Sequence, residues 1–355
     1  MRAARAGPEY GEAMSDLLQK LLSERPWLLA DGATGTDLFA MGLQHGDAPE
    51  LWNLEQEEKV RHHYRSFIAA GSDIVLTNSF GGTANRLKLH GAQDRVRKIN
   101  AAAAALLRQE IEAAGRKVVC AGSVGPTGDL FAPLGPLSHE EGVAAFREQC
   151  EGLAEGGADL AWIETMSAPA ELMAALEGAA AAGLPAVCTL SFDTNGRTMM
   201  GVAPAELPEL LCNAPAAPIA FGGNCGTGAA ELVVALLAMS EAAGPDAILV
   251  AKANCGIPEF IDGEVRYSGT PELMARYAVL ARAAGARIIG GCCGTTAEHV
   301  LAMRRALEET PPGPRPTLAE IEAALGPISA GGRSDGAPRE GRREGRRRRG
   351  SAAVS

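Results

Sequence analysis

Eight short apolar runs follow one another along the chain, and each ends in small or polar residues. Such runs, bounded by turn residues, are typical of strands buried in a parallel sheet. The residues between them carry apolar positions three or four apart, which predicts helices. In EEKVRHHYRSFIAAG, for example, Val60, Tyr64, Phe67 and Ile68 share one face before Gly71 ends the helix. The eight runs are WLLADGATG, DIVLTNSF, VVCAGSVGP, LAWIETM, AVCTLSF, IAFGGNCG, AILVAKANCG and ARIIGGCCG.

Strand and helix therefore alternate eight times, which favours an α/β fold of one domain, the (β/α)₈ TIM barrel. An open doubly wound sheet fits less well, because no Gly-rich dinucleotide turn follows the first strand, and DGATGT resembles that turn only superficially. Further helices are expected at Asp94 to Ala114, His139 to Gly156, Ala168 to Ala182, Ala229 to Ala243, Pro271 to Ala284 and Thr296 to Leu307.

The barrel is expected to span residues 27–311, between two segments of different character. Residues 1–26 form an N-terminal extension, whose first thirteen residues show no periodicity, and Met14 is a second possible start. Residues 312–330 hold a short helix from Thr317 to Leu325. Residues 331–355 are rich in Gly, Ser and Arg with few apolar residues, so we expect a disordered tail.

Composition narrows the kinds of partner. Apolar residues make up 46% and charged residues 21%, as in ordinary globular proteins. The net charge is −10 although the tail carries eight arginines, so the barrel is acidic and a poor partner for nucleic acid. No run reaches the roughly 18 apolar residues of a membrane span. The eight cysteines follow no apolar signal segment, so we expect a soluble, cytoplasmic protein with reduced thiols.

Three thiols and two carboxylates occur where the predicted strands end. Because the carboxyl ends of barrel strands meet at one face, these side chains are expected to converge there. A set of three thiolates suits Zn²⁺, which keeps its fourth position open for a substrate in catalytic sites. A thiol bound in that position would lose its proton and become a nucleophile. The residues are Asp31, Glu164, Cys292, Cys293 and one of Cys225 and Cys255.

The vicinal pair needs a backbone that leaves strand geometry, since neighbouring strand residues point to opposite faces. Flanking glycines in GGCCG provide that freedom. The alternative is that Cys292 and Cys293 are small buried residues without chemistry, which is how we interpret the cysteines at 120, 150, 188 and 212. Cys225 and Cys255 both lie in Asn-Cys-Gly turns, and the pattern does not choose between them.

The two acidic residues and a glycine-rich loop suggest a site for an amino acid. Glu164 emerges from a buried strand and Asp31 precedes the loop, so both are candidates to bind an ammonium group, although Asp before Gly is also common in turns. Amides of Gly32, Ala33, Thr34 and Gly35 are candidates to hold a carboxylate.

Several motifs resemble those of the homocysteine S-methyltransferases: DGATGT, GSDIVLTNSF, GPTGDL, GGADLAWIET, the GGNCG turn and above all GGCCGTTAEH. The resemblance covers roughly Trp27 to Leu307. It implies a zinc-bearing (β/α)₈ domain in which Cys225, Cys292 and Cys293 are the ligands and Cys255 is not. It also implies that Asp31 and Glu164 bind the amino group of homocysteine, with the loop from Gly32 to Gly35 at its carboxylate.

The methyl donor is a separate question. Trp52 in PELWNLE is similar to a tryptophan of the betaine and S-methylmethionine branches, and its ring suits an onium group, although packing over the barrel mouth is the alternative. TNSFGGT has Gly81 where the betaine branch has Tyr, and the long C-terminal arm of the betaine enzymes is missing. The motifs as a whole are similar to those of the first domain of cobalamin-dependent methionine synthase.

The sequence therefore predicts a zinc-dependent enzyme that makes methionine from homocysteine and betaine or a similar onium donor. The first alternative is the homocysteine-activating component of a split cobalamin-dependent methionine synthase, to which a separate corrinoid protein delivers the methyl group. A thiol redox or metal-storage protein is a third interpretation. Nothing in the sequence indicates the oligomeric state.

Overall fold

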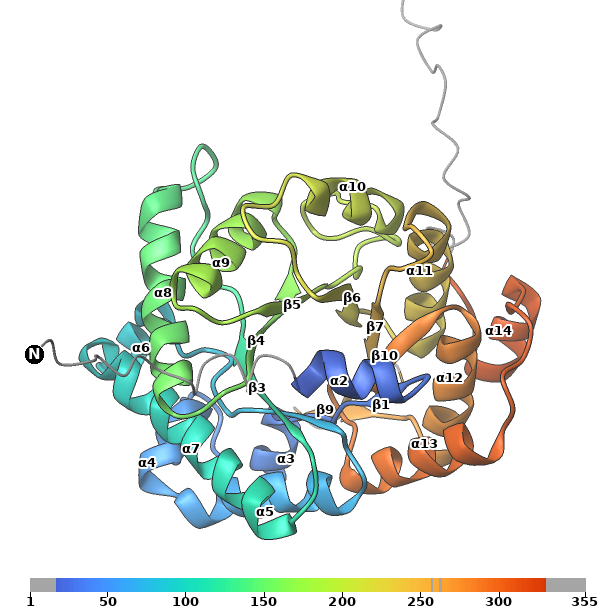
Figure 1. Ribbon diagram of the computed structural model, residues 1–355, viewed down its shortest axis with the longest axis horizontal. Helices are drawn as coiled ribbons and strands as arrows, with labels where there is room; N and C mark the ends of the chain where they lie inside the picture. Colours follow the sequence, from blue (N-terminus) through green and yellow to red (C-terminus); the bar gives the residue numbers. More distant parts are fainter. Residues whose placement is uncertain (1–16, 257, 262–263, 330–355) are drawn as a thin grey trace, which may run out of the picture.

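The computed structural model describes residues 17–256, 258–261 and 264–329, and within them eight parallel strands form a ring (Figure 1). A parallel bridge between Ala30 and Ile74 joins the first strand to the second, so the ring closes. The predicted single-domain (β/α)₈ barrel is confirmed. In the order of the ring the strands are β1 (Leu28–Leu29), β10 (Ala286–Gly291), β7 (Leu249–Ala253), β6 (Ala220–Cys225), β5 (Ala186–Leu190), β4 (Leu160–Met166), β3 (Val119–Val124) and β2 (Ile74–Leu76).

The long helices surround the ring, each within a few residues of its predicted range. Local signals start several of them: Ser138 and Glu141 form a capping box at the first turn of α8, for example. The helices outside the barrel are α5 (Glu57–Ala69), α7 (Val96–Ala114), α8 (His139–Glu155), α9 (Pro169–Ala181), α10 (Leu207–Cys212), α11 (Ala229–Ala242), α12 (Pro271–Ala283) and α13 (Ala297–Glu309), and α14 (Leu318–Leu325) packs on α11 and α12.

Short elements shape the loops at the carboxyl ends of the strands. The hairpin β8 (Pro258–Ile261) and β9 (Glu264–Tyr267) is inserted between β7 and α12. The loops after β1 and β2 contain α3 (Gly35–Ala40), α4 (Trp52–Glu55) and α6 (Ala84–Leu87). Among the described residues, no helix combines the length and the apolar character needed to cross a membrane.

A helix that the sequence analysis missed, α2 (Leu17–Glu24), closes the amino-terminal end of the barrel. In Figure 1 it lies across the centre of the ring. Its leucines at 18, 21 and 22 are buried against the inward-facing side chains of the strands, including Ile74 and Trp162. Residues 17–24 of the predicted extension are therefore part of the folded barrel. The predicted loose stretch at residues 1–13 and the predicted tail at 331–355 lie outside the described residues.

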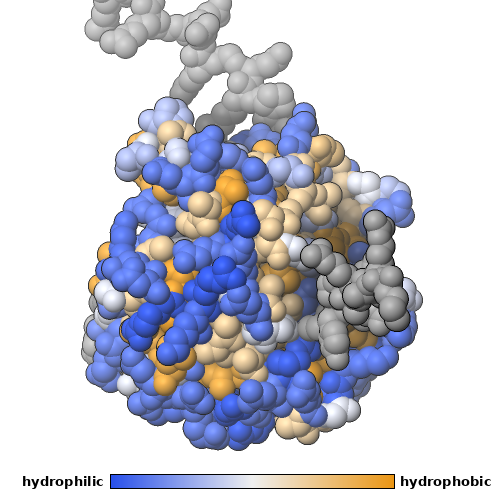
Figure 2. All heavy atoms as spheres, turned by 60° about the vertical axis from the view of Figure 1, so that its left-hand side comes forward, coloured by the Kyte–Doolittle hydropathy of each residue, from blue (hydrophilic) through white to orange (hydrophobic). Residues whose placement is uncertain are grey.

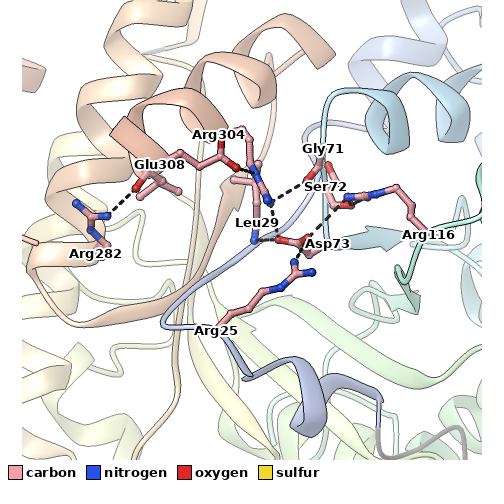
Figure 3. A network of polar contacts seen from close by, with 10 residues as sticks. Arg25, Leu29, Gly71, Ser72, Asp73, Arg116, Arg282, Arg304 and Glu308 are labelled. Atoms are coloured by element: carbon pink, nitrogen blue, oxygen red, sulfur yellow. Dashed lines mark hydrogen bonds and ion pairs between the residues drawn. The ribbon is translucent and has the colours of Figure 1, made fainter. Parts of the chain in front are cut away.

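Asp73, immediately before β2, ties this end of the barrel together (Figure 3). Its carboxylate accepts hydrogen bonds from Arg25 at 2.7 Å, from Arg304 of α13 at 3.0 Å and from the Leu29 amide at 3.0 Å. Arg116 lies 3.7 Å away. One buried carboxylate thus connects the end of α2, the strand β1, α13 and the segment before β3. It holds β1 in place, and Asp31 follows β1 at the opposite end of the barrel.

The face in Figure 2 is mostly hydrophilic, with small separate hydrophobic areas. Several of the exposed large apolar residues belong to loops that follow strands: Leu89 after β2, Leu130 and Leu134 after β3, and Met199 after β5. These loops surround the barrel mouth, where the carboxyl ends of the strands meet.

Candidate active site

Three cysteine sulfurs meet at the mouth of the barrel. Cys225 is the last residue of β6, and Cys292 and Cys293 directly follow β10. All three Sγ atoms lie within 4.8 Å of one another, and those of Cys225 and Cys293 are 3.8 Å apart. Thiolates bound tetrahedrally to one ion at about 2.3 Å would be about 3.8 Å apart. The cluster therefore has the size and the donor atoms for one soft metal ion.

Backbone geometry explains how two neighbouring cysteines reach one point. The strand β10 stops at Gly291, so both residues lie in a turn, and Gly294 has a φ of +77° that favours glycine. A Cβ on Gly291 would lie 2.2 Å from the Thr295 side chain. The amide of Cys292 donates to the Ala253 carbonyl at 2.6 Å. The turn that the glycines predicted is present and is held against β7.

The Asn-Cys-Gly turn after β6 is strained and braced. Cys225 has a φ of +60°, which is unusual for a residue other than glycine. The Asn224 side chain accepts a hydrogen bond from the Thr165 amide and one from the Thr189 hydroxyl, both at 2.8 Å, and its Nδ2 donates to the Thr165 hydroxyl at 2.8 Å. Backbone strain of this kind persists where the surroundings over-determine it. Asn224 thus holds the conformation that aims Cys225 at the vicinal pair.

The second Asn-Cys-Gly turn has a different task. Cys255 is buried, and its thiol donates to the Gly269 carbonyl at 3.3 Å instead of joining the three sulfurs. Its neighbour Asn254 accepts from the Cys293 amide at 3.1 Å and donates to the Gly226 carbonyl at 2.7 Å. The structure therefore brings Cys225, not Cys255, to the pair, and it gives Asn254 the role of joining the two cysteine turns.

The sulfurs influence one another strongly. Hydrogen bonds from the thiols of Cys225 and Cys292 lower the pKa of Cys293, so one negative charge forms readily. That charge makes each further deprotonation harder, and the pKa of Cys225 is raised by its hydrogen bonds to Cys292 and Cys293. A cluster that bears several thiolates needs a cation at its centre.

A cavity of about 490 Å³ opens beside the cysteines. Its inner wall comes from the strand ends and includes Ser123, Glu164, Lys252 and the three cysteines, together with the loop from Gly32 to Thr36. Its outer wall comes from the loops after β1 and β2. There the lining residues are Phe39, Asp47, Ala48, Pro49, Glu50, Phe80, Gly81, Arg86, Leu87, Leu89 and His90.

The loop predicted to bind a carboxylate lies on the wall of the cavity. Gly32, Ala33, Thr34 and Gly35 all line the cavity. The Ala33 amide donates to the Thr295 carbonyl at 3.0 Å, which ties the loop to the turn after Cys293. A Cβ on Gly32 would lie 2.3 Å from that carbonyl oxygen, so only glycine allows this approach.

Asp31 is placed differently from the sequence expectation. It is fully buried, accepts from the Leu76 amide at 2.7 Å, and forms an ion pair with Lys252. It is not among the residues that line the cavity, whereas Lys252 is. The sequence analysis missed Lys252, although a lysine inside the apolar strand AILVAKANCG was a usable signal, since buried lysines are rare without a partner.

Glu164 is the acidic residue at the inner end of the cavity. The Ser123 hydroxyl donates to its carboxylate at 2.5 Å. Burial raises the pKa of Glu164 to about 7, against the opposing influence of the Lys252 charge. A carboxylate that is costly to bury in its charged form gains most when a cationic ligand arrives.

Trp52 does not reach the cavity. Its side chain is only 8% exposed and belongs to the main hydrophobic core, and the Lys59 ammonium lies 4.5 Å from the centre of its ring. The packing alternative describes its position in this structure. The phenyl rings that line the cavity belong to Phe39 and Phe80.

Gly81, the departure from the tyrosine of the betaine branch, also has a local reason. Its amide donates to Glu50 at 2.6 Å, and a Cβ at this position would lie 2.9 Å from the same carboxylate oxygen. Glu50 is buried, which raises its pKa. A side chain at position 81 would therefore crowd Glu50, so the packing of the outer wall favours glycine here.

Replacing Glu164 by glutamine is expected to stabilise the protein in a pH-dependent way. The folded pKa of about 7 exceeds the usual value of 4.5, so the wild type loses stability as the pH rises between them. Glutamine does not titrate and still accepts from Ser123. Urea unfolding should therefore show a gain on the order of 2 to 3 kcal/mol larger at pH 8 than at pH 5. Exposed Glu309→Gln is the control, and an equal effect of Glu164→Gln at both pH values would contradict the burial argument.

Comparisons with known proteins agree with the fold. The chain spans about a quarter of the length of the curated relatives it matches: methionine synthase of Mycobacterium tuberculosis is 30% identical over 81% of this chain and 25% of the relative, and that of Mycobacterium leprae is 28% identical over 81% and 24%.

Solved structures match over nearly their whole length. The metallated form of the homocysteine methyltransferase MmuM from Escherichia coli is 28% identical, with a TM-score of 0.67 over 81% of this chain and 99% of that one. A methyltransferase from Methanosarcina mazei, 14% identical with a TM-score of 0.54 over 83% and 98%, shows the fold alone. The family model of homocysteine S-methyltransferase matches residues 28–307. The chain belongs to the homocysteine S-methyltransferase family.

Proposed function

We propose that this protein transfers a methyl group to the thiol of homocysteine, with one zinc ion held by Cys225, Cys292 and Cys293. The observation that supports a metal ion is the cluster of three sulfurs, in which the Sγ atoms of Cys225 and Cys293 are 3.8 Å apart. A zinc ion there would supply the Lewis acidity that keeps a substrate thiol deprotonated at neutral pH. The eight free cysteines favour a reducing compartment, which supports a place in the cytoplasm.

The inner cavity supplies the groups that would hold the amino acid. Glu164, with Ser123 donating to it, is the carboxylate on the inner wall of the cavity and suits the substrate ammonium. The loop from Gly32 to Gly35 lies on the same wall, and its amides suit the substrate carboxylate except that of Ala33, which donates to the Thr295 carbonyl. Asp31 acts from behind this wall through its pair with Lys252.

For the donor, we propose a small onium compound that carries a carboxylate, as betaine does. Arg86 supports this choice: it lines the outer cavity, and its side chain makes no hydrogen bond or ion pair within the described part of the chain. Gly128 leaves it room, since a Cβ there would lie 3.0 Å from the guanidinium. An unpaired guanidinium beside Phe39 and Phe80 suits an anionic group at one end of a ligand and a methylated cation at the other.

The donor assay offers betaine, S-methylmethionine, thetins of the dimethylsulfoniopropionate type, and methylcobalamin, each with homocysteine, and measures methionine. We expect product with betaine, and we expect Arg86→Met to raise the KM for betaine about 10- to 100-fold, because a charge-assisted contact is lost. The KM for homocysteine should not change. Lys88→Met removes a nearby exposed cation outside the cavity and is the matched control. Turnover of methylcobalamin alone would contradict the betaine proposal.

A corrinoid donor on a separate protein is the second candidate. The relatives named methionine synthase are about four times longer than the matched region. Leu89 is 70% exposed and, like Leu130, Leu134 and Met199, lies in a loop around the barrel mouth, where a protein that delivers a methyl group would have to dock. This candidate predicts methionine from methylcobalamin or a methylated corrinoid protein and none from small onium donors.

A further inference from the structure

The charges that face the inner cavity are not the two carboxylates expected from the sequence. Asp31 lies behind the wall and is already paired, so the groups that line the cavity are Glu164 and Lys252. One carries a carboxylate from β4 and the other an ammonium from β7. Beside the three cysteines, the inner wall therefore presents one acidic and one basic side chain to a ligand.

Lys252 has hydrogen-bonding capacity left over. Burial opposes its charged form, but the carboxylates of Asp31 and Glu164 outweigh that cost and raise its pKa. A lysine ammonium has three N–H donors. One is used by Asp31, the face of Trp162 lies 5.6 Å away, and no other acceptor among the described residues takes a hydrogen bond from it. Two donors remain for whatever occupies the cavity.

Lys252 lies next to the loop from Gly32 to Gly35, and this position suggests which chemical group of a ligand it binds. Its partner Asp31 directly precedes Gly32, the first residue of the loop that lines the cavity. A carboxylate above this loop would be close to the ammonium as well as to the amides. We propose that Lys252 binds the α-carboxylate of the substrate while Glu164 binds its α-ammonium, so that the enzyme recognises a zwitterionic amino acid. This rests on the proposed function, in which the substrate is an amino-acid thiol.

The competing explanation is that Lys252 only neutralises buried Asp31. Two thiols separate the explanations: 4-mercaptobutyrate is homocysteine without its amino group, and 3-mercaptopropylamine is homocysteine without its carboxylate. The informative variant is the double replacement Asp31→Asn/Lys252→Met, because it removes both charges of the pair and does not leave Asp31 as an unpaired buried carboxylate. Binding to the zinc-loaded protein is measured by calorimetry, without any methyl donor.

We expect the double variant to bind homocysteine and 4-mercaptobutyrate about 10- to 100-fold more weakly than the wild type does, and 3-mercaptopropylamine equally well. Glu164→Gln should show the reciprocal pattern, with weaker binding of homocysteine and 3-mercaptopropylamine only. Lys252→Gln keeps a donor for Asp31 and removes the charge, so it tests the same pattern if the double variant does not fold. Circular dichroism and zinc content check each variant.

The failures can be told apart. If the wild type binds homocysteine and the double variant or Lys252→Gln binds it equally tightly, Lys252 only neutralises Asp31 and the inference is wrong. If the zinc-loaded wild type binds none of the three thiols, the proposed function itself is wrong, and the inference about the carboxylate fails with it.

Discussion

Replacing Cys225 by serine is expected to remove the bound metal and to lower methionine formation about a thousandfold or more. The structure places this sulfur 3.8 Å from that of Cys293, in a conformation that Asn224 maintains. Serine fits the same space but offers a hard, protonated oxygen in place of a soft thiolate. Loss of Lewis-acid stabilisation is worth several kcal/mol, and about 4 kcal/mol corresponds to a thousandfold in rate. Metal analysis of the purified variant and the rate of methionine formation measure the two effects.

The matched control is Cys255→Ser, which changes the same residue type in the other Asn-Cys-Gly turn. Because the Cys255 thiol points to the Gly269 carbonyl, this variant should keep about one zinc per chain and most of its activity. Zinc loss in Cys255→Ser would indicate a closed shell of four sulfurs and would contradict the catalytic proposal. Full methionine formation by metal-free Cys225→Ser would contradict the zinc proposal itself.

The barrel could be predicted from sequence because each strand is buried on both sides and each long helix on one. Those two patterns leave runs and periodicities that do not depend on distant residues, so all eight barrel strands and most helices could be predicted, whereas the β8–β9 hairpin was missed. The helix α2 was missed, although Leu18, Leu21 and Leu22 have helical spacing, because the stretch before it shows no pattern. The helix α10 was also missed, because its six residues are too few to show a helical periodicity in the sequence.

The candidate site could be predicted only as far as strand ends determine it. The carboxyl ends of barrel strands gather at one face, which is why Cys225, Cys292, Cys293 and Glu164 come together. Which way a side chain points within a turn depends on tertiary contacts. The sequence pattern therefore could not choose Cys225 over Cys255 without the family resemblance.

The remaining misplacements have the same physical origin. The position of Trp52 is set by the packing of a loop without periodicity, and the structure puts it in the core beneath Lys59. Asp31 meets the requirement that a buried charge be paired through Lys252, more than two hundred residues away, so its neighbours in sequence gave no warning. The partner comes from β7, which is separated from β1 in the ring only by β10.

The two ends of the same strands perform different work, so stability and chemistry should be separable by mutation. At the mouth, the strand ends carry Cys225 in a strained conformation and the buried Glu164, which both lower stability and both belong to the candidate site. At the other end, α2 and the network around Asp73 compensate by burying apolar surface and pairing charges. A mutation at that end should lower the free energy of unfolding of the barrel. In the molecules that remain folded, the site should be unchanged.

Asp73→Ala is the sharpest test of this separation, with an expected loss of about 3 kcal/mol in the free energy of unfolding. The Asp73 side chain is 2% exposed, and removing it leaves Arg25, Arg304 and the Leu29 amide without their shared acceptor. The arginines remain partly exposed, so water limits the loss.

Urea unfolding gives the free energy for this variant and for Asp129→Ala, a control that removes a half-exposed carboxylate paired with Lys88 and should cost less than about 1 kcal/mol. The folded Asp73→Ala protein should keep its zinc and its KM for homocysteine. Equal midpoints for the two variants would show that the network is not what holds β1, and a loss of zinc from folded Asp73→Ala would show that the two ends are coupled.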